Sequence, residues 1–236
     1  MSKLPKCWAV IPAAGIGERV GSSIPKQYLQ IAGKAILQHA INPFANNSRI
    51  VGITVVLHPE DSHFETLELS NAACEKINTV MGGATRAHSV LNALESFKTK
   101  IAKDDFVLVH DAARPCLTND DLDLLIDACL EHQVGGIIGS RVADTIKRVE
   151  NNSIVETLDR ENIWRAYTPQ MFKFGLLHEA MQKAFDHNVC ITDEASALEY
   201  IGYQPCMVEG DARNIKVTTA EDISLAEIFI QEEKNK

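Results

Sequence analysis

Several features that identify common classes of protein are absent from this sequence. Its six cysteines include no CxxC pair and no spacing typical of a zinc site, which argues against a metal centre built on thiolates. Basic residues are outnumbered, with 23 Lys and Arg against 32 Asp and Glu, and the resulting net charge of −9 disfavours a nucleic-acid partner. No uninterrupted apolar stretch approaches the length that a membrane span requires.

A secretory signal is also missing. The apolar run from Trp8 to Pro12 is too short for the core of a signal peptide, and no cleavage site follows it. Together with the absence of a membrane span, this predicts a cytoplasmic protein. The 236 residues suffice for one α/β domain with a core of its own, so we expect a single domain over 1–236.

The residues that are present indicate a layered α/β sandwich, Rossmann-like, with a mostly parallel central sheet. Short apolar runs typical of strands alternate with stretches whose apolar residues recur at helical spacing. The expected strands are 7–12, 52–57, 77–81, 106–110 and 206–209. The expected helices are 35–44, 85–97, 120–132, 175–186, 193–200 and 220–230, the last with Thr219 as its N-cap.

Residues 141–167 interrupt this alternation. Two runs of period two, 142–149 and 154–158, flank the turn-forming residues 150–153, which predicts a projecting β-hairpin arm. A two-stranded ribbon has little core of its own and is marginally stable in water, so we expect the arm to pack against a second copy in a homodimer. The alternative is a long insertion that folds back on its own domain.

The loop after the first expected strand has the composition of a phosphate-binding loop. Its small residues, from Ala13 to Gly17, allow backbone N–H groups to approach phosphates closely, and Arg19 and Lys26 add positive charge. Two familiar phosphate loops are excluded, since the Walker pattern is absent and Val20 stands where the dinucleotide fingerprint needs its third glycine. The loop leaves the carboxyl end of its strand, where open α/β sheets bind ligands.

Asp111 follows the expected strand at 106–110. A carboxylate at that position is suited to contact Mg²⁺ held by a triphosphate, because the ion prefers hard oxygen ligands. The same aspartate could instead cap the turn that follows. His110 ends an apolar strand, and we interpret it as a hydrogen-bonded structural residue rather than an acid or base; Cys116, nearby in sequence, is interpreted as a small core residue rather than a nucleophile.

Five segments together resemble one family, the 2-C-methyl-D-erythritol 4-phosphate cytidylyltransferases of the non-mevalonate isoprenoid pathway. The resemblance covers essentially the whole chain. The segments are IPAAGIGERVGSSIPKQY (11–28), GGATRAHSV (82–90), VHDAARP (109–115), ITDEASALE (191–199) and EGDARNIKVT (209–218). The resemblance implies a homodimeric enzyme that condenses CTP with methylerythritol phosphate, giving 4-diphosphocytidyl-2-C-methyl-D-erythritol and pyrophosphate, with Mg²⁺ as cofactor.

The resemblance also implies roles for individual residues. Catalysis is assigned to four cations, two of which grip the triphosphate: Arg19, Lys26, Arg160 and Lys216. The nucleotide-binding residues are Pro12, Ala13, Ala14, Gly15, Gly17, Arg19, Lys26, Gly83, Ala84, Ser89, Asp111 and Ala112. The substrate-binding residues are Asp111, Arg114, Thr145, Arg160, Thr168, Thr192 and Lys216, with Thr145 and Arg160 contributed by the partner's arm. Asp111 is the candidate metal ligand, although the triphosphate would hold most of the ion's coordination.

One residue departs from the pattern, and two other functions compete. Some relatives carry a carboxylate where this chain has Ala84, which bears on the preference for cytosine. The first competing function is cytidylyl transfer to ribitol 5-phosphate or another polyol or sugar phosphate. The second is a nucleotide-binding dimer without catalysis, and cations on both sides of the reacting phosphorus argue against it.

The chemistry itself explains why no histidine-based dyad is expected. An anionic phosphate oxygen is already a competent nucleophile, so its attack on the α-phosphorus needs no general base. The barrier comes from bringing two polyanions together in the correct orientation. The sequence therefore predicts that the protein contributes positive charge and positioning rather than proton transfer.

Overall fold

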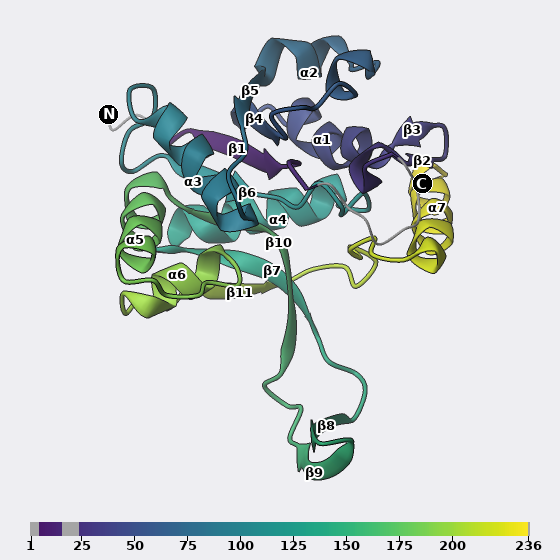
Figure 1. Ribbon diagram of the computed structural model, residues 1–236, viewed down its shortest axis with the longest axis vertical. Coiled ribbons are helices and arrows are strands. Elements are labelled where there is room, and N and C mark those ends of the chain that lie inside the picture. The colour runs from purple at the N-terminus through teal and green to yellow at the C-terminus, as the bar shows by residue number, and fades with distance from the viewer. Residues whose placement is uncertain (1–4, 16–23, 236) are drawn as a thin grey trace.

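The computed structural model describes residues 5–15 and 24–235 of the chain. A seven-stranded sheet lies at its centre, in the order β11-β7-β10-β6-β1-β4-β5 (Figure 1). Only β10 runs antiparallel to its two neighbours, and the other pairings in the sheet are parallel. The predicted fold class, an α/β sandwich with a mostly parallel sheet, is confirmed.

The elements have the following bounds. The strands of the central sheet are β1 (Cys7–Pro12), β4 (Ile50–Leu57), β5 (Ile77–Met81), β6 (Phe106–Val109), β7 (Gly135–Arg141), β10 (Trp164–Lys173) and β11 (Cys206–Glu209). Two short pairs stand apart from it, β2 (Gln30–Ile31) with β3 (Lys34–Ala35), and β8 (Ile146–Glu150) with β9 (Ser153–Leu158). The helices are α1 (Ile36–Asn46), α2 (Asn71–Lys76), α3 (Arg86–Phe97), α4 (Asn119–Glu131), α5 (Phe174–Asp186), α6 (Glu194–Tyr200) and α7 (Ala220–Lys234), with short 3-10 turns at Lys26–Tyr28 and Phe64–Thr66.

Helices cover both faces of the sheet, and each face has its own core. Side chains alternate along a strand, so in β1 Ala9 and Ile11 belong to one core while Val10 belongs to the other. The first core includes buried residues of α1 and α4, and the second includes those of α3, α5 and α6. Because the strands are apolar on both faces, the sheet is buried between two helical layers.

The segment predicted as an arm forms a ribbon that projects away from the sheet (Figure 1). Its tip is the antiparallel pair β8–β9, and the turn between them places Asn151 and Asn152 at φ of 48° and 62°. Asparagine tolerates this left-handed region better than most residues, which suits a tight hairpin turn. The base of the segment differs from the prediction, since Arg141 ends β7 and residues 164–167 lie in β10, both within the central sheet.

Helix α7 packs outside the two main cores, over Ile31, Ile36 and Val217. Thr219 caps its first turn as predicted, accepting a hydrogen bond from the backbone N–H of Asp222. None of the helices within 5–15 and 24–235 combines the length and the apolar composition that a membrane span requires.

Candidate active site

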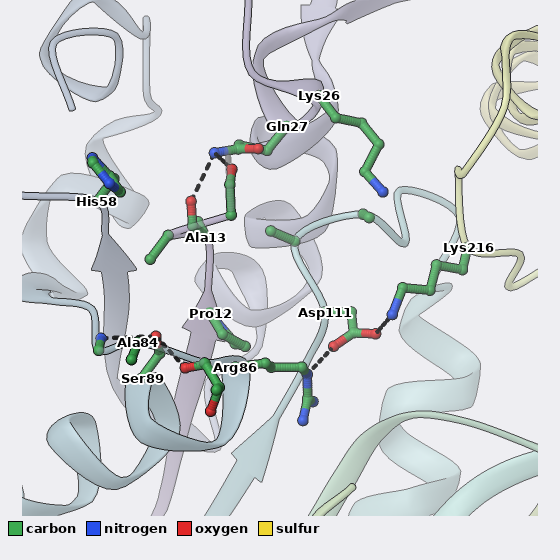
Figure 2. Close-up of a pocket in the computed structure, with 16 residues that line it drawn as sticks. Pro12, Ala13, Lys26, Gln27, His58, Ala84, Arg86, Ser89, Asp111 and Lys216 are labelled. Carbon is green, nitrogen blue, oxygen red and sulfur yellow. Dashed lines mark hydrogen bonds and ion pairs between the residues drawn. The ribbon is translucent and has the colours of Figure 1, made fainter. Parts of the chain in front are cut away.

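A pocket of about 460 Å³ opens at the carboxyl ends of β1, β4, β5 and β6. Parallel strands end at the same edge of a sheet, so the loops that follow them meet there. Figure 2 shows Lys26 and Lys216 on one side of this pocket and His58 and Ala84 on the other. The described residues that line it are Pro12, Ala13, Ala14, Gly15, Lys26, Gln27, His58, Gly83, Ala84, Thr85, Arg86, Ser89, Asp111, Ala112, Ala113 and Lys216.

One wall is formed by the loop after β1 and by the 3-10 turn that begins at Lys26. The buried side chain of Gln27 joins them, because its Nε2 donates to the carbonyls of Ala13 at 2.7 Å and Gly15 at 3.1 Å. These bonds fix the loop against the turn. The Lys26 side chain therefore projects into the pocket from a backbone that the loop itself supports (Figure 2).

The opposite wall is the loop from Gly82 to Thr85 and the first turn of α3. Thr85 caps this helix by accepting from the N–H of His88, and the hydroxyl of Ser89 accepts from the N–H of Gly83 at 3.1 Å. Glycine is required at 82, since a Cβ there would lie 2.4 Å from the Cβ of Ala14. The two walls are thus brought together as closely as their backbones allow.

A line of alternating charges crosses the floor of the pocket. Asp111 pairs with Arg86 through Oδ1 (2.8 Å to Nε) and with Lys216 through Oδ2 (2.7 Å to Nζ), as Figure 2 shows. Burial alone would raise the pKa of Asp111, but the Arg86 guanidinium and the Lys216 ammonium hold that pKa well below its usual range. The carboxylate is therefore ionised and keeps both cations at the pocket.

Buried hydrogen bonds support Asp111 from below. The hydroxyl of Thr168 accepts from the N–H of Asp111 at 3.0 Å and lies 3.1 Å from Nδ1 of His110, whose Nε2 lies 3.0 Å from the carbonyl of Arg114. His110 is fully buried, and this burial lowers its pKa to about 4. His110 is thus buried and hydrogen-bonded, as expected of a structural residue. Cys116 is buried in the core that α7 covers, as expected of a small core residue, and this burial raises the pKa of its thiol to about 12.

The structure brings together the predicted nucleotide-binding residues that it describes. Each of the following lines the pocket: Pro12, Ala13, Ala14, Gly15, Lys26, Gly83, Ala84, Ser89, Asp111 and Ala112. Lys216 lines it as well. Gly17 and Arg19 lie outside the described residues.

The other predicted substrate-binding residues lie elsewhere. Thr168 and Arg114 are buried behind Asp111, and Nη1 of Arg114 donates to the carbonyl of Asn214 at 2.6 Å. Thr192 lines a neighbouring pocket, which is also lined by Arg86 and His88. Thr145 and Arg160 are exposed on the arm and do not line the pocket of their own chain.

Five residues that line the pocket were not among the predicted site residues, namely Gln27, His58, Thr85, Arg86 and Ala113. Gln27 directly follows Lys26, and Arg86 lies inside the segment GGATRAHSV, so both were within recognised motifs. Their contacts are with groups distant in the sequence, and nothing local indicates them. His58 follows β4 at the same edge of the sheet as Asp111, and that position was the one signal available.

Comparison with known proteins points to one family. The family model described as 2-C-methyl-D-erythritol 4-phosphate cytidylyltransferase matches residues 7–232. A protein of that name from Aeromonas hydrophila is 48% identical over 230 residues, covering 97% of this chain and 91% of the relative. Another, from Haemophilus ducreyi, is 46% identical over 225 residues, covering 95% of this chain and 96% of the relative.

Solved structures agree with these sequence relatives. The structure of 2-C-methyl-D-erythritol 4-phosphate cytidylyltransferase from Francisella tularensis superimposes with a TM-score of 0.81 at 38% identity, covering 95% of this chain and 99% of that one. A structure titled 4-diphosphocytidyl-2C-methyl-D-erythritol synthase gives a TM-score of 0.82 at 37% identity, over 96% and 99% of the two chains.

Proposed function

The chain belongs to the 2-C-methyl-D-erythritol 4-phosphate cytidylyltransferase family, and from this premise we propose that it transfers the cytidylyl group of CTP to methylerythritol phosphate. The products are 4-diphosphocytidyl-2-C-methyl-D-erythritol and pyrophosphate, and the reaction serves the synthesis of isoprenoid precursors. The observation that carries the proposal is the single pocket in which the small-residue loop, Lys26, Asp111 and Lys216 meet.

The reaction exchanges one phosphoanhydride bond for another. An oxygen of the acceptor phosphate forms a bond to the α-phosphorus of CTP, and the bond from that phosphorus to the β-bridging oxygen breaks. Pyrophosphate leaves with the electron pair, in line with the attacking oxygen, so no proton transfer is required. The protein's task is to neutralise charge and hold the reactants in line.

We assign the cations of the pocket to the two ends of this reaction. Lys26, projecting from the wall that carries the phosphate loop, neutralises charge on the α-phosphoryl and pyrophosphate groups, and Arg19 contributes to the same task. Lys216, held at the floor by Asp111, meets the acceptor phosphate. Charge on both sides of the reacting phosphorus favours catalysis over mere binding of a nucleotide.

The donor set of the pocket fits a divalent cation that is carried mainly by the triphosphate. Among the residues that the structure describes, no group of three or more His, Cys, Asp and Glu side chains could hold a metal ion, and Asp111 is the one carboxylate lining the pocket. Mg²⁺ is commonly held by one or two carboxylates together with substrate phosphates and water. Asp111 is thus the side chain that would contact it, and the ion would supply Lewis-acid stabilisation of phosphoryl charge.

Recognition of the base is assigned to backbone groups of residues 83 and 84. The Ser89 hydroxyl is engaged by the loop itself, accepting from the N–H of Gly83 and donating to the carbonyl of Thr85 at 3.0 Å. It therefore fixes the conformation of the loop whose residues Gly83 and Ala84 line the pocket. A carboxylate at position 84 is not needed for that contact.

We also propose that the catalytic unit is a homodimer of single nucleotidyltransferase domains, with 141–167 as the dimerisation arm. The tip of the ribbon exposes apolar side chains, since Val149 pairs with Ile154 across the strands and these two residues are 53% and 66% exposed. Exposed apolar surface of this kind favours an interface. A partner's arm would bring Thr145 and Arg160 to a pocket that this chain's own arm does not reach.

A direct assay tests the function. Purified protein, CTP, Mg²⁺ and methylerythritol phosphate should release pyrophosphate and form a product with the mass of the cytidine diphosphate conjugate. Omission of the acceptor should abolish release, which separates transfer from simple hydrolysis. Ribitol 5-phosphate is the matched competitor, and a kcat/KM for it equal to or above that for methylerythritol phosphate would contradict the proposal. Fractionation of cells tests the predicted cytoplasmic location separately.

A further inference from the structure

A buried carboxylate that does not line the pocket extends its line of charges into the protein. Glu194, the first residue of α6, has a side chain only 1% exposed. Its Oε1 accepts from Nη1 of Arg86 at 2.7 Å, and its Oε2 accepts from Nη2 of the same guanidinium at 3.1 Å. The sequence of charges from the interior to the pocket is therefore Glu194, Arg86, Asp111, Lys216.

The four groups come from four separate parts of the chain. Arg86 begins α3, Asp111 follows β6, Glu194 begins α6, and Lys216 lies in the segment between β11 and α7. Arg86 and Glu194 are 108 residues apart in sequence. The ion pairs therefore link α3, α6, the loop after β6 and the segment before α7 at one edge of the sheet.

Burial makes Glu194 dependent on Arg86. An isolated ionised carboxylate in a protein interior is strongly destabilised, and burial accordingly raises the pKa of Glu194 even though the Arg86 guanidinium opposes the change. The two-pronged contact offsets this cost, because it satisfies both carboxylate oxygens with charged donors. Such a costly arrangement at the edge of a pocket favours a functional role over a stabilising one.

The pair also determines how Arg86 can meet Asp111. A guanidinium is a planar fork, and when Glu194 engages both terminal nitrogens, Nε is the donor that reaches Asp111. Nε of Arg86 contacts only Oδ1 of Asp111, and Oδ2 is therefore available to pair with Lys216. Without the Glu194 charge, the fork is free to turn its terminal nitrogens to Asp111 and take both oxygens, in competition with Lys216.

We propose that Glu194 is a positioning residue of the reaction: by fixing Arg86 it orients Asp111, and so keeps the Lys216 ammonium where the acceptor phosphate binds. This inference rests on the proposed function, in which Lys216 meets that phosphate. Glu194 is only 1% exposed and does not line the pocket that contains Asp111 and Lys216, so it acts on them through Arg86. The effect of losing it should therefore fall on the acceptor and spare the nucleotide, whose loop lies on another wall of the pocket.

The substitution Glu194→Gln tests this, because it removes the charge and keeps the shape. We expect the KM for methylerythritol phosphate to rise about tenfold or more, since a misplacement of roughly 1 Å at a reacting group is costly. The KM for CTP should stay within about twofold of the wild-type value. The control is Asp105→Asn, which neutralises another buried carboxylate, bonded to the N–H groups of Lys6 and Ala102 at the opposite end of β6.

The control separates positioning from general loss of stability. Both variants should lower the midpoint of urea unfolding, and only Glu194→Gln should raise the acceptor KM. An unchanged acceptor KM in Glu194→Gln, equal rises for both substrates, or the same rise in Asp105→Asn would each overturn the inference.

A second variant covers the case in which Glu194→Gln does not fold. Arg86→Lys keeps the positive charge but replaces the fork by a single ammonium that cannot bridge the two carboxylates in the same way. It should show the same acceptor-selective defect, and a normal acceptor KM would overturn the inference. A wild-type protein that fails to turn over methylerythritol phosphate with CTP would instead refute the proposed function.

Discussion

In the pocket, charged side chains are held in place by other groups of the same chain. Asp111 bonds to both Arg86 and Lys216, and its backbone N–H is bonded to Thr168 beneath it. On the arm, Thr145 and Arg160 stand on an exposed ribbon, where Nη1 of Arg160 donates to the carbonyl of Ala143. One region is organised by its own fold, whereas the other presents its residues on an exposed ribbon, which we propose packs against a partner.

From this difference we expect the pocket and the arm to contribute differently to the reaction. Electrostatic stabilisation is most effective where charges are preorganised and partly removed from water, as they are in the pocket. An exposed arginine on a ribbon can stabilise a bound phosphate to a comparable degree only when a second surface shields it from water. Loss of Lys26, the pocket cation assigned to the reacting phosphoryl groups, should therefore affect the rate, and loss of an arm cation should affect acceptor binding.

The largest expected effect is on the pocket side. Lys26→Ala should lower kcat by about 10²-fold or more, the scale for removing one preorganised donor from a transition state. Steady-state kinetics with both substrates saturating would measure it. Near-normal turnover would show that catalysis in the pocket does not depend on this preorganised charge.

A second prediction concerns the support beneath the pocket. The folded-state pKa of His110 is lowered to about 4 from an ordinary value of 6.5, so below pH 6.5 the unfolded chain takes up a proton that the folded chain refuses. Stability should fall as pH drops through that window, by about 2 kcal/mol between pH 7 and pH 5 from this group alone. Urea unfolding of wild type and His110→Gln at both pH values would measure the contribution. Equal changes in the two proteins would show that His110 does not titrate in this way.

The smallest of the three effects belongs to the arm. Arg160→Ala should raise the KM for methylerythritol phosphate by about tenfold, the equivalent of roughly 1.4 kcal/mol, and leave the KM for CTP nearly unchanged. Lys147→Ala is a matched control, since this cation also lies on the ribbon and is hydrogen-bonded to Thr157 of the facing strand. A rise of the same size for both substrates in Arg160→Ala would erase the distinction between arm and pocket.

Much of the fold could be predicted from the sequence, and the exceptions have physical causes. The bounds of β1, β5 and β11 match the prediction, because apolar runs between turn signals are a strong local pattern. The strand β7 was missed, as its first residues are Gly135 and Gly136, which have no strand preference of their own. The strand β10 was also missed, since it includes Pro169, which is uncommon in central strands, and its residues 164–167 were assigned to the arm.

The site divides in the same way. Loop residues such as Gly15 and Lys26 could be predicted, because the small and basic residues typical of a phosphate loop lie close together in the sequence. Arg86 and Glu194 could not, since their partnership exists only once α3 and α6 are packed at the same edge of the sheet. Local sequence patterns therefore identify residues that line the pocket, whereas an ion pair between distant residues depends on tertiary contacts.

The most direct test of a site shared between one chain's pocket and its partner's arm is a mixing experiment. Lys26→Ala has a defective pocket and an intact arm, and Arg160→Ala has the reverse, so a mixed dimer would contain one site with both parts intact. The two variants are unfolded together, refolded and assayed with methylerythritol phosphate well below its wild-type KM, where Arg160→Ala alone is also impaired. The shared site then predicts activity of about a quarter of wild type at random pairing, well above either variant alone. Activity equal to the mean of the two separate variants would contradict it.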